Sequence, residues 1–422
     1  MHGLGHVRVD DAPQVIGGQA VSVGITGSST QDVGHLAESS CLRGLLAPHV
    51  VLGEPLAFGI GGGIGAAYWV FEYKGLPAPL VSILTRFAWD SSQRFLEEGC
   101  RRLGATSIVK ETGSATVAQR NLDQALADGR SAIVWVSRAL SADNDLPPEM
   151  ADWAGEIVLV RASGSGDSYR VEDRGTPPFE LSRDELAHTR SVVKRDKHRL
   201  LSVDPPGQEP IDVGAAVRDG MRACARELLA PPMHLPAMAA SNSALNGFRK
   251  LAQLMADPRD PRGWPRLFPP GRPLHSGLVA LYRALGVGGG GALRPLYAAF
   301  LDEAAALLAD PRLTELGVRY RELGTRWSAL AESALPDDVA LLARTRALLV
   351  HRRAVFVARG AAAASEIHAI DAELRALEDE ATTSFPLDAA GCQALLSSLS
   401  AQLTEIVRLE QAAAEQLAAA AG

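Results

Sequence analysis

The sequence predicts an α+β domain over residues 31–205, followed by an all-helical domain over residues 206–422. Before residue 205, short β-branched runs alternate with helical stretches. The segment VDPPGQEP (203–210) contains three prolines, which exclude a helix there. After it, Ala, Leu, Glu and Arg recur at helical spacing and almost no strand signal remains. A chain of 422 residues is long enough for two cores, and residues 1–30 form an N-terminal extension.

The predicted elements of the first domain follow one another in a regular order. A helix with Ser39 and Ser40 at its start contains Cys41, and it leads into the glycine cluster GIGGGIG (59–65) and the aromatic segment AAYWVFEY (66–73). Ser182 and Glu185 have the spacing of a helix capping box. The remaining expected elements are a strand at 80–87, a helix at 90–103, a strand at 106–111, a helix at 117–127, a strand at 131–137, and strands at 156–162 and 168–173 flanking the turn GSGD.

The second domain is expected to be a helical bundle, because its apolar residues follow the 3.6-residue period between Pro- and Gly-rich connectors. Its last segment, EQAAAEQLAAAAG (410–422), is expected to fray, as chain ends often do. Trp264 lies in the Pro-rich segment PRGWPRLFPPGRP, for which we expect a packed loop over the cleft between the domains.

Composition and charge exclude several classes of protein. A net charge of −7, from 42 Lys+Arg and 49 Asp+Glu, argues against nucleic-acid binding. No run of about 18 apolar residues suggests a membrane span, and no leader is recognisable, so we expect a cytoplasmic protein. The four cysteines lie far apart in the sequence, without a CxxC pair or a Cys/His cluster. We therefore expect free thiols and no metal.

The glycine cluster is a candidate cofactor site. Gly61, Gly63 and Ala66 satisfy a loose form of the dinucleotide-binding pattern, but the acidic residue expected about 20 positions later is missing. We therefore expect no cofactor. The glycines are better explained by a close approach of the backbone, either to another element or to a ligand.

Cys41 has two interpretations. A single cysteine on the apolar face of a helix is usually a small buried hydrophobic residue. If the helix begins at Ser39 or Ser40, however, the positive end of its dipole would favour the thiolate and lower the pKa of Cys41. In that case Cys41 is a candidate nucleophile.

Several motifs in order resemble a known family. The segment from His35 to Tyr73, with its FGIGGGIG loop, is similar to the N-terminal domain of the butirosin-biosynthesis acyltransferase family. ALADGRSAIVWVS, EIVLVRA, YRVEDRG and LSRDELAHTRS follow in the order of that family, and residues 246–265 and 288–305 resemble the helical domain that commonly follows it. The resemblance implies a papain-like, cysteine-protease-like fold. It also implies transfer of an acyl group from a carrier-protein thioester to an amine in natural-product assembly.

The resemblance assigns candidate site residues but departs from the pattern of the family. The His-Cys pair of the family aligns with Leu36 and Ala37, so Cys41 lies one helical turn further on. A short gap would instead align His35 with the histidine. The second family histidine is replaced by Glu156. The acidic partner of the family corresponds to Asp173, and Ser137 replaces an expected aspartate.

These departures leave two functions open. Proton transfer from a thiol to a carboxylate is uphill by about 5–6 kcal/mol from ordinary pKa values, so a Cys–His acyl-enzyme cycle is not expected. Glu156 could act in acid–base chemistry with Asp173 or Glu38 as a second group, as in a cyclisation or condensation. The alternative is a protein without catalytic activity that binds or organises other components. The expected substrate-binding residues are Gly61, Gly62, Gly63, Tyr68, Trp69 and Ser137. The expected partners are a small biosynthetic intermediate, an acyl or peptidyl carrier protein and a second copy in a homodimer.

Overall fold

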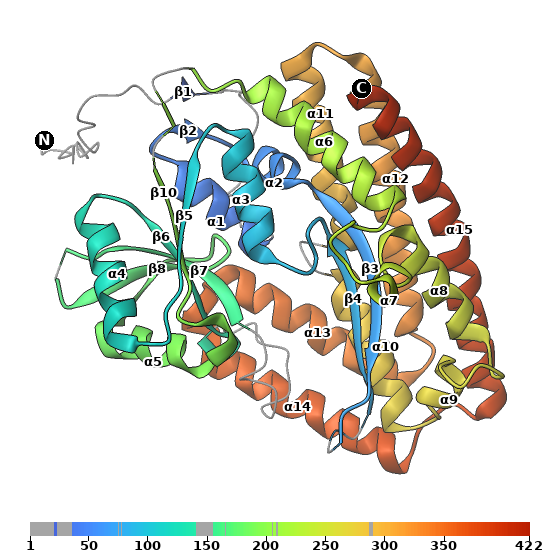
Figure 1. The fold of residues 1–422 in the computed structure, drawn as a ribbon. Helices are drawn as coiled ribbons and strands as arrows, with labels where there is room; N and C mark the ends of the chain where they lie inside the picture. Colours follow the sequence, from blue (N-terminus) through green and yellow to red (C-terminus); the bar gives the residue numbers. More distant parts are fainter. Residues whose placement is uncertain are drawn as a thin grey trace, which may run out of the picture.

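The computed structural model describes residues 21–22, 36–74, 76, 78–140, 155–164, 166–204, 206–207, 210–286 and 290–422. It is an α+β fold with its main sheet in the N-terminal half and helices throughout the C-terminal half, as predicted (Figure 1). Of the predicted N-terminal extension, only β1 (Val21–Ser22) is described, and it pairs in parallel with β2 (Val50–Val51).

The main sheet has six strands in the order β5-β10-β6-β7-β8-β9, and every neighbouring pair is antiparallel. Its side chains alternate between two apolar clusters. Ile133 and Ile157 face α1, whereas Val134 and Val158 face α4 and α5. The strands are β5 (Thr106–Lys110), β6 (Ala132–Ser137), β7 (Gly155–Ala162), β8 (Ser168–Glu172), β9 (Phe179–Ser182) and β10 (Leu200–Asp204).

The helices of the N-terminal half start largely where the sequence predicts. The capping box of α5 is present, because Ser182 Oγ accepts the Glu185 N–H and the Glu185 carboxylate accepts the Ser182 N–H. The helix with Cys41 begins two residues earlier than expected, at Ala37. The bounds are α1 (Ala37–Leu46), α2 (Glu54–Gly61), α3 (Ser92–Arg102), α4 (Ala115–Ala127) and α5 (Arg183–Val192), with short 3-10 turns at Arg138–Leu140 and Lys194–Asp196.

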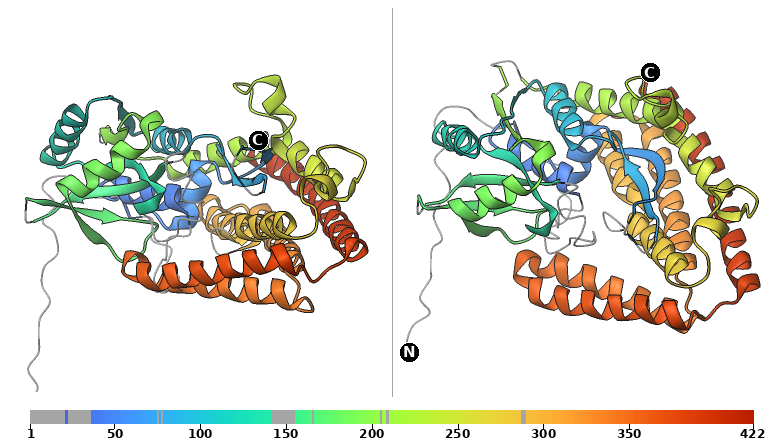
Figure 2. Two further views of the ribbon diagram at one scale, coloured as in Figure 1. Left: turned by 90° about the horizontal axis from the view of Figure 1, so that it is seen from below. Right: turned by 60° about the horizontal axis from the view of Figure 1, so that its bottom comes forward.

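The C-terminal half is helical, and its helices pack on one face of a β-ribbon that comes from the N-terminal half. Figure 2 shows α13 and α14 lying side by side along one edge of the molecule. The helices are α6 (Val213–Leu229), α7 (Ala237–Ala240), α8 (Ala244–Ala256), α9 (Trp264–Leu267), α10 (Arg272–Gly286), α11 (Arg294–Leu308), α12 (Pro311–Ala334), α13 (Ala340–Arg359), α14 (Ala364–Thr383) and α15 (Ala389–Ala421), with 3-10 turns at Gly291–Leu293 and Gly360–Ala363.

The ribbon is the antiparallel hairpin of β3 (Ile64–Phe71) and β4 (Leu80–Arg86), which packs on α8 and α10. The Tyr68 N–H donates to Asn242 O at 2.9 Å, and Trp264 Nε1 donates to the Tyr68 hydroxyl at 2.8 Å. One apolar cluster runs from Ala37 to Ala421. The two halves therefore share a core, and the domain boundary at residue 205 stays a prediction.

The prediction that the C-terminal segment frays is wrong. Helix α15 continues to Ala421, and Ala414 and Leu417 are fully buried. The helix packs against α6, α8 and α12. Alanine is small enough to permit this close contact, so the segment that resembled a frayed end contributes an apolar face.

Candidate functional site

Candidate residues from four separate segments of the chain lie near one another. Glu38 and Cys41 are on α1, which packs against β7. Glu156 is the second residue of β7 and pairs with Val136 of β6, one residue before Ser137. Asp173 follows the last residue of β8. The charges of Glu38, Asp173 and Glu156 all act on the Cys41 thiol. We call these residues, together with the arginines that contact them, the carboxylate cluster.

The Cys41 thiol is held in its protonated form. Its side chain is buried, and burial is the main cause that raises the pKa of Cys41 well above its usual value. The negative charges of Glu38, Asp173 and Glu156 raise it further. Because α1 begins at Ala37, Cys41 lies beyond the first turn, where the effect of the helix dipole is weak. The expectation of a lowered pKa at Cys41 is therefore wrong.

The start of α1 is occupied by a carboxylate of the protein itself. Oε1 of Glu54, at the beginning of α2, accepts the Leu36 N–H at 3.1 Å and the Ser39 hydroxyl at 2.7 Å. Glu54 is buried. The Glu54 carboxylate thus accepts hydrogen bonds at the start of α1, where the sequence predicted Ser39 and Ser40 as the capping residues.

Glu156 is the centre of a partly buried ion-pair network. Its Oε2 lies 3.2 Å from Arg174 Nη2 and 3.4 Å from Arg138 Nε. Arg174 Nε also contacts Asp173 Oδ1 at 2.9 Å. Burial raises the pKa of Glu156 above its ordinary value, although the two arginines oppose the shift. Glu156 is thus a carboxylate that takes up a proton more readily than an exposed glutamate does.

Arg174 connects the cluster to the helical half. Its guanidinium lies over the ring of Phe356 on α13, 5.2 Å from the ring centroid. Arg174 has a positive φ of 51°, a conformation that few residues other than glycine adopt. The guanidinium forms ion pairs with both Glu156 and Asp173, and these ion pairs offset the energetic cost of the strained backbone.

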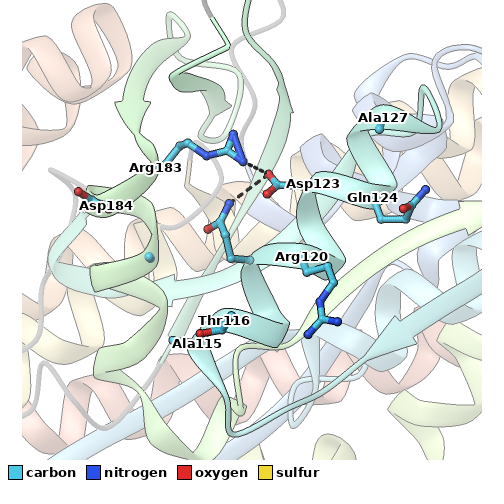
Figure 3. Close-up of a pocket in the computed structure, with 10 residues that line it drawn as sticks. Ala115, Thr116, Arg120, Asp123, Gln124, Ala127, Arg183 and Asp184 are labelled. Carbon is cyan, nitrogen blue, oxygen red and sulfur yellow. Dashed lines mark hydrogen bonds and ion pairs between the residues drawn. The ribbon is translucent and has the colours of Figure 1, made fainter.

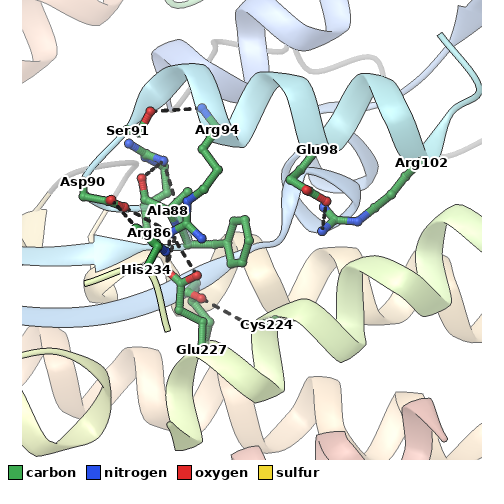
Figure 4. A network of polar contacts seen from close by, with 12 residues as sticks. Arg86, Ala88, Asp90, Ser91, Arg94, Glu98, Arg102, Cys224, Glu227 and His234 are labelled. Atoms are coloured by element: carbon green, nitrogen blue, oxygen red, sulfur yellow. Dashed lines mark hydrogen bonds and ion pairs between the residues drawn. The ribbon is translucent and has the colours of Figure 1, made fainter. Parts of the chain in front are cut away.

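Glu38 is held by donors from β4 and α3. Its Oε1 accepts the Ser92 hydroxyl at 2.6 Å and contacts Arg86 Nη2 at 3.0 Å. Figure 4 shows a second polar network that lies beside Arg86. There Glu227 of α6 accepts the Ala88 N–H at 2.7 Å and pairs with Arg94 at 3.1 Å. The position of Glu38 is therefore fixed by contacts that reach α6.

The glycines predicted to bind substrate lie against aromatic rings. A Cβ atom on Gly61 would meet the Phe95 ring, one on Gly62 would meet Phe87, and one on Gly63 would come within 2.4 Å of Tyr297. Gly62 and Gly63 also have positive φ values of 124° and 70°. Close approach of one element to another explains the cluster. A contact of these glycines with substrate stays a prediction.

The two aromatic residues of the predicted binding set differ in their environment. Tyr68 is 2% exposed, and its hydroxyl accepts the Trp264 N–H. Trp69 is half-buried on the other face of β3, where it stacks on Phe71. Ser137 is buried at the end of β6. His35 lies outside the described residues.

Two family models match the chain. Residues 37–140 match the model of the N-terminal domain of butirosin biosynthesis protein H, and residues 184–340 match a domain of unknown function (DUF4872). Residues 37–140 are thus similar to the N-terminal domain of butirosin biosynthesis protein H. No curated protein matches the chain. The family resemblance stated from the motifs is thereby confirmed.

The butirosin biosynthesis protein H N-terminal domain contains only part of the carboxylate cluster. Glu38, Cys41 and Ser137 lie within residues 37–140, whereas Glu156 and Asp173 lie between the two matched ranges. Phe356, which supports Arg174, lies beyond both. The site therefore combines the family domain with segments that neither family model covers.

Three arginines of the cluster were missed from the sequence. Arg138 and Arg174 directly follow the candidate residues Ser137 and Asp173, and Arg86 ends β4. A signal was present, because carboxylates at the ends of buried strands require cations nearby. An arginine next to each of two candidate positions is the pattern that could have revealed them.

A hollow of the described surface lies away from the cluster. It lies between α4 and α5, has a volume of about 660 Å³ and is open to solvent. In Figure 3, Arg183 points toward Asp123, an ion pair that occupies part of this space. The hollow is on the face of the sheet opposite α1. No candidate residue lines it.

The described residues contain no group of three or more His, Cys, Asp or Glu side chains arranged to hold a metal ion. None of the helices in the same residues combines the length and apolarity that a membrane crossing requires.

Proposed function

We propose that this chain is a natural-product biosynthetic enzyme that acts on an acyl intermediate, with Glu156 as the general acid–base. The observation that carries the proposal is the pairing of a largely buried carboxylate, whose pKa is raised, with two arginines beside an otherwise unused thiol. Perturbed ionisable groups of this kind cluster at functional sites. The name of the matched family supports a biosynthetic role.

In the proposed reaction an amine attacks the carbonyl carbon of an acyl thioester. Glu156 accepts the proton of the amine as the C–N bond forms, and it returns that proton to the sulfur as the C–S bond breaks. Arg174 and Arg138, at 3.2 and 3.4 Å from Glu156, supply positive charge for the oxyanion that develops on the carbonyl. A carboxylate with a raised pKa suits both halves of this cycle.

Cys41 does not form an acyl-enzyme in this proposal. Its thiolate is opposed by burial and by four carboxylates. The described residues contain no histidine bonded to it. A papain-like fold and a carrier protein as acyl donor complete the proposal, and both rest on the family resemblance. We also propose a cytoplasmic location, which rests on the sequence alone.

The test is amide formation from short acyl N-acetylcysteamine thioesters and a panel of primary amines, followed by mass spectrometry. Glu156→Gln should lower the rate by at least about 100-fold, the usual contribution of a general acid–base. Glu180→Gln is the matched control, since Glu180 lies on β9 of the same sheet and is exposed. Cys41→Ala should retain activity, and intact-mass analysis should find no acyl adduct. Full activity of Glu156→Gln would refute the proposal.

A non-catalytic binding protein is the second candidate, and one observation favours it. Each carboxylate of the cluster already has an arginine partner, so the network satisfies itself without a substrate. If this candidate is correct, the wild-type protein converts none of the thioesters. Glu156→Gln would then lower the thermal stability without changing any rate of the pathway.

A further inference from the structure

Four aromatic rings follow one another along the β3–β4 hairpin. The ring centroids of Trp89 and Trp69 are 5.8 Å apart, those of Trp69 and Phe71 are 6.1 Å apart, and those of Phe71 and Tyr73 are again 6.1 Å apart. The Trp69 and Phe71 rings are within 9° of parallel. We call Trp89, Trp69, Phe71 and Tyr73 the aromatic ladder.

The ladder lies on the open face of the hairpin. Side chains alternate along a strand, and the face with Tyr68, Val81 and Ile83 is buried against the helical half. The ladder face is half-exposed, and Phe71 is 36% exposed. Solvent can therefore reach a row of rings that packing within the chain does not require.

The neighbours of the ladder on β4 carry no charge. Trp69 is opposite Ser82 and Phe71 is opposite Leu80 in the register of the hairpin. Both partners are half-buried. The first charged residue on this face of β4 is Arg86, at the end that reaches the carboxylate cluster. An uncharged, apolar ligand matches this face.

One end of the ladder is close in the sequence to two residues that contact the carboxylate cluster. Trp89 lies between Arg86 and Ser92 in the sequence, and both of these residues contact Oε1 of Glu38. Glu38 in turn acts on the Cys41 thiol. The rings thus lead away from Glu38 toward the turn of the hairpin.

Two hydrogen-bond donors at this end lack acceptors. The indole N–H groups of Trp69 and Trp89 are buried, and neither has a hydrogen-bond partner within the described part of the chain. A buried donor without an acceptor costs about 1–3 kcal/mol. A carbonyl group is the simplest acceptor that a ligand could bring.

The dimensions of the ladder fit a chain better than a protein. Two strands present a face roughly 10 Å wide, and the ladder is roughly 18 Å long, or about 200 Å². A stable protein interface needs about 800 Å² from each partner. The face is narrow and extended, as an acyl chain is.

We propose that the aromatic ladder binds the apolar chain of the acyl substrate, with the acyl carbonyl near Trp89 and the chain end toward Tyr73. The proposal rests on the proposed function, because it takes the carboxylate cluster as the place of reaction. It assigns substrate selectivity to the length of the ladder. Chains that extend further along the rings bind more tightly.

The test is calorimetric titration with N-methyl amides of straight-chain carboxylic acids of about four to about ten carbons, which contain the acyl carbonyl but no leaving group. Affinity should rise about threefold with each added methylene, as expected for a partly open apolar site. Phe71→Ser should flatten this dependence beyond the shorter chains. Tyr73→Ser should weaken only the longest.

Val318→Ser is the matched control, because Val318 is also an exposed apolar residue, at 45%, but lies on α12. It should leave every affinity unchanged. An affinity that does not depend on chain length, or equal effects of Phe71→Ser and Val318→Ser, would overturn the proposal. Binding is measured without turnover, so the result is separate from that of Glu156→Gln. That variant should bind the amides normally even where it abolishes amide formation.

Discussion

Nε of Arg294 lies 2.6 Å from Oε1 of Glu410, and both side chains are completely shielded from solvent. Arg294 begins α11 and Glu410 lies in α15. Trp327 Nε1 donates to the same carboxylate oxygen at 2.8 Å. Arg294 Nη1 also donates to the carbonyl oxygens of Ala292 and Thr85. One buried ion pair therefore joins two helices of the C-terminal half to β4 of the N-terminal half.

Breaking this pair should destabilise the whole protein. Glu410→Leu leaves the Arg294 charge buried without its partner, so the free energy of unfolding should fall by about 3–5 kcal/mol. The double variant Arg294→Met with Glu410→Leu should recover most of the loss. Urea denaturation followed by circular dichroism measures both. Arg408→Ala is the control, since it breaks an exposed pair with Glu405 on the same helix and should cost less than about 1 kcal/mol. Equal effects of Glu410→Leu and Arg408→Ala would contradict this account.

Tyr68→Phe should reduce stability and leave ligand binding unchanged. The substitution removes the acceptor of the Trp264 indole, which is fully buried, and an unsatisfied buried donor costs about 1–3 kcal/mol. The thermal midpoint measures the loss, and titration with the N-methyl amides measures binding. A lower affinity at an unchanged thermal midpoint would instead place Tyr68 in the substrate site, as the sequence predicted.

The sequence predicts those parts of the fold that depend on local signals. The capping box at Ser182 and Glu185 and the change from strands to helices after Asp204 are properties of neighbouring residues, and both occur in the structure. The start of α1 was not predictable in this way. Its donors are satisfied by Glu54, which belongs to another helix.

In the candidate site, too, the sequence does not reveal properties that depend on contacts between distant segments. The motif order located Glu38, Cys41, Glu156 and Asp173, which the fold brings together. It left the sign of the shift in the pKa of Cys41 open, because that sign depends mainly on burial, then on the charge of Glu38 on the same helix and on carboxylates more than 100 residues away in the sequence. The buried end of α15 was missed for a related reason, since alanine-rich sequence does not show whether a partner helix covers it.

Gly63→Ala should be more destabilising than Gly104→Ala, although both glycines have a φ near 70°. A residue with a Cβ atom pays about 1–2 kcal/mol for this conformation at either position. At Gly104 the new atom meets nothing within 4 Å, whereas at Gly63 it meets the Tyr297 ring. Overpacking adds about 1–3 kcal/mol. Thermal unfolding of the two variants isolates the packing contribution, and equal losses would show that the ring moves aside freely.

Cys41 should make the protein less stable as the pH rises above about 8.5, the usual pKa of a thiol in an unfolded chain. Burial and four carboxylates raise the pKa of Cys41 in the folded state, so the folded protein keeps a proton that the unfolded chain has already lost. The contribution to stability is complete below the unfolded pKa. It is lost at about 1.4 kcal/mol per pH unit between the two pKa values.

The readout is the difference between wild-type and Cys41→Ala in urea denaturation from pH 7 to pH 10. Subtraction removes the contributions of the other groups that titrate in this range. They include the thiols of Cys100 and Cys224, which lose their protons here in the unfolded chain, although burial raises their pKa values to about 12 in the folded protein. The difference should fall with pH, and Ser40→Ala, a neighbour on α1 that does not titrate, should give a flat difference. Iodoacetamide should alkylate Cys41 more slowly than it alkylates free cysteine at pH 8. Rapid alkylation of the folded protein would show a thiolate at Cys41, and it would restore the covalent acyl-transfer mechanism that the carboxylate cluster argues against.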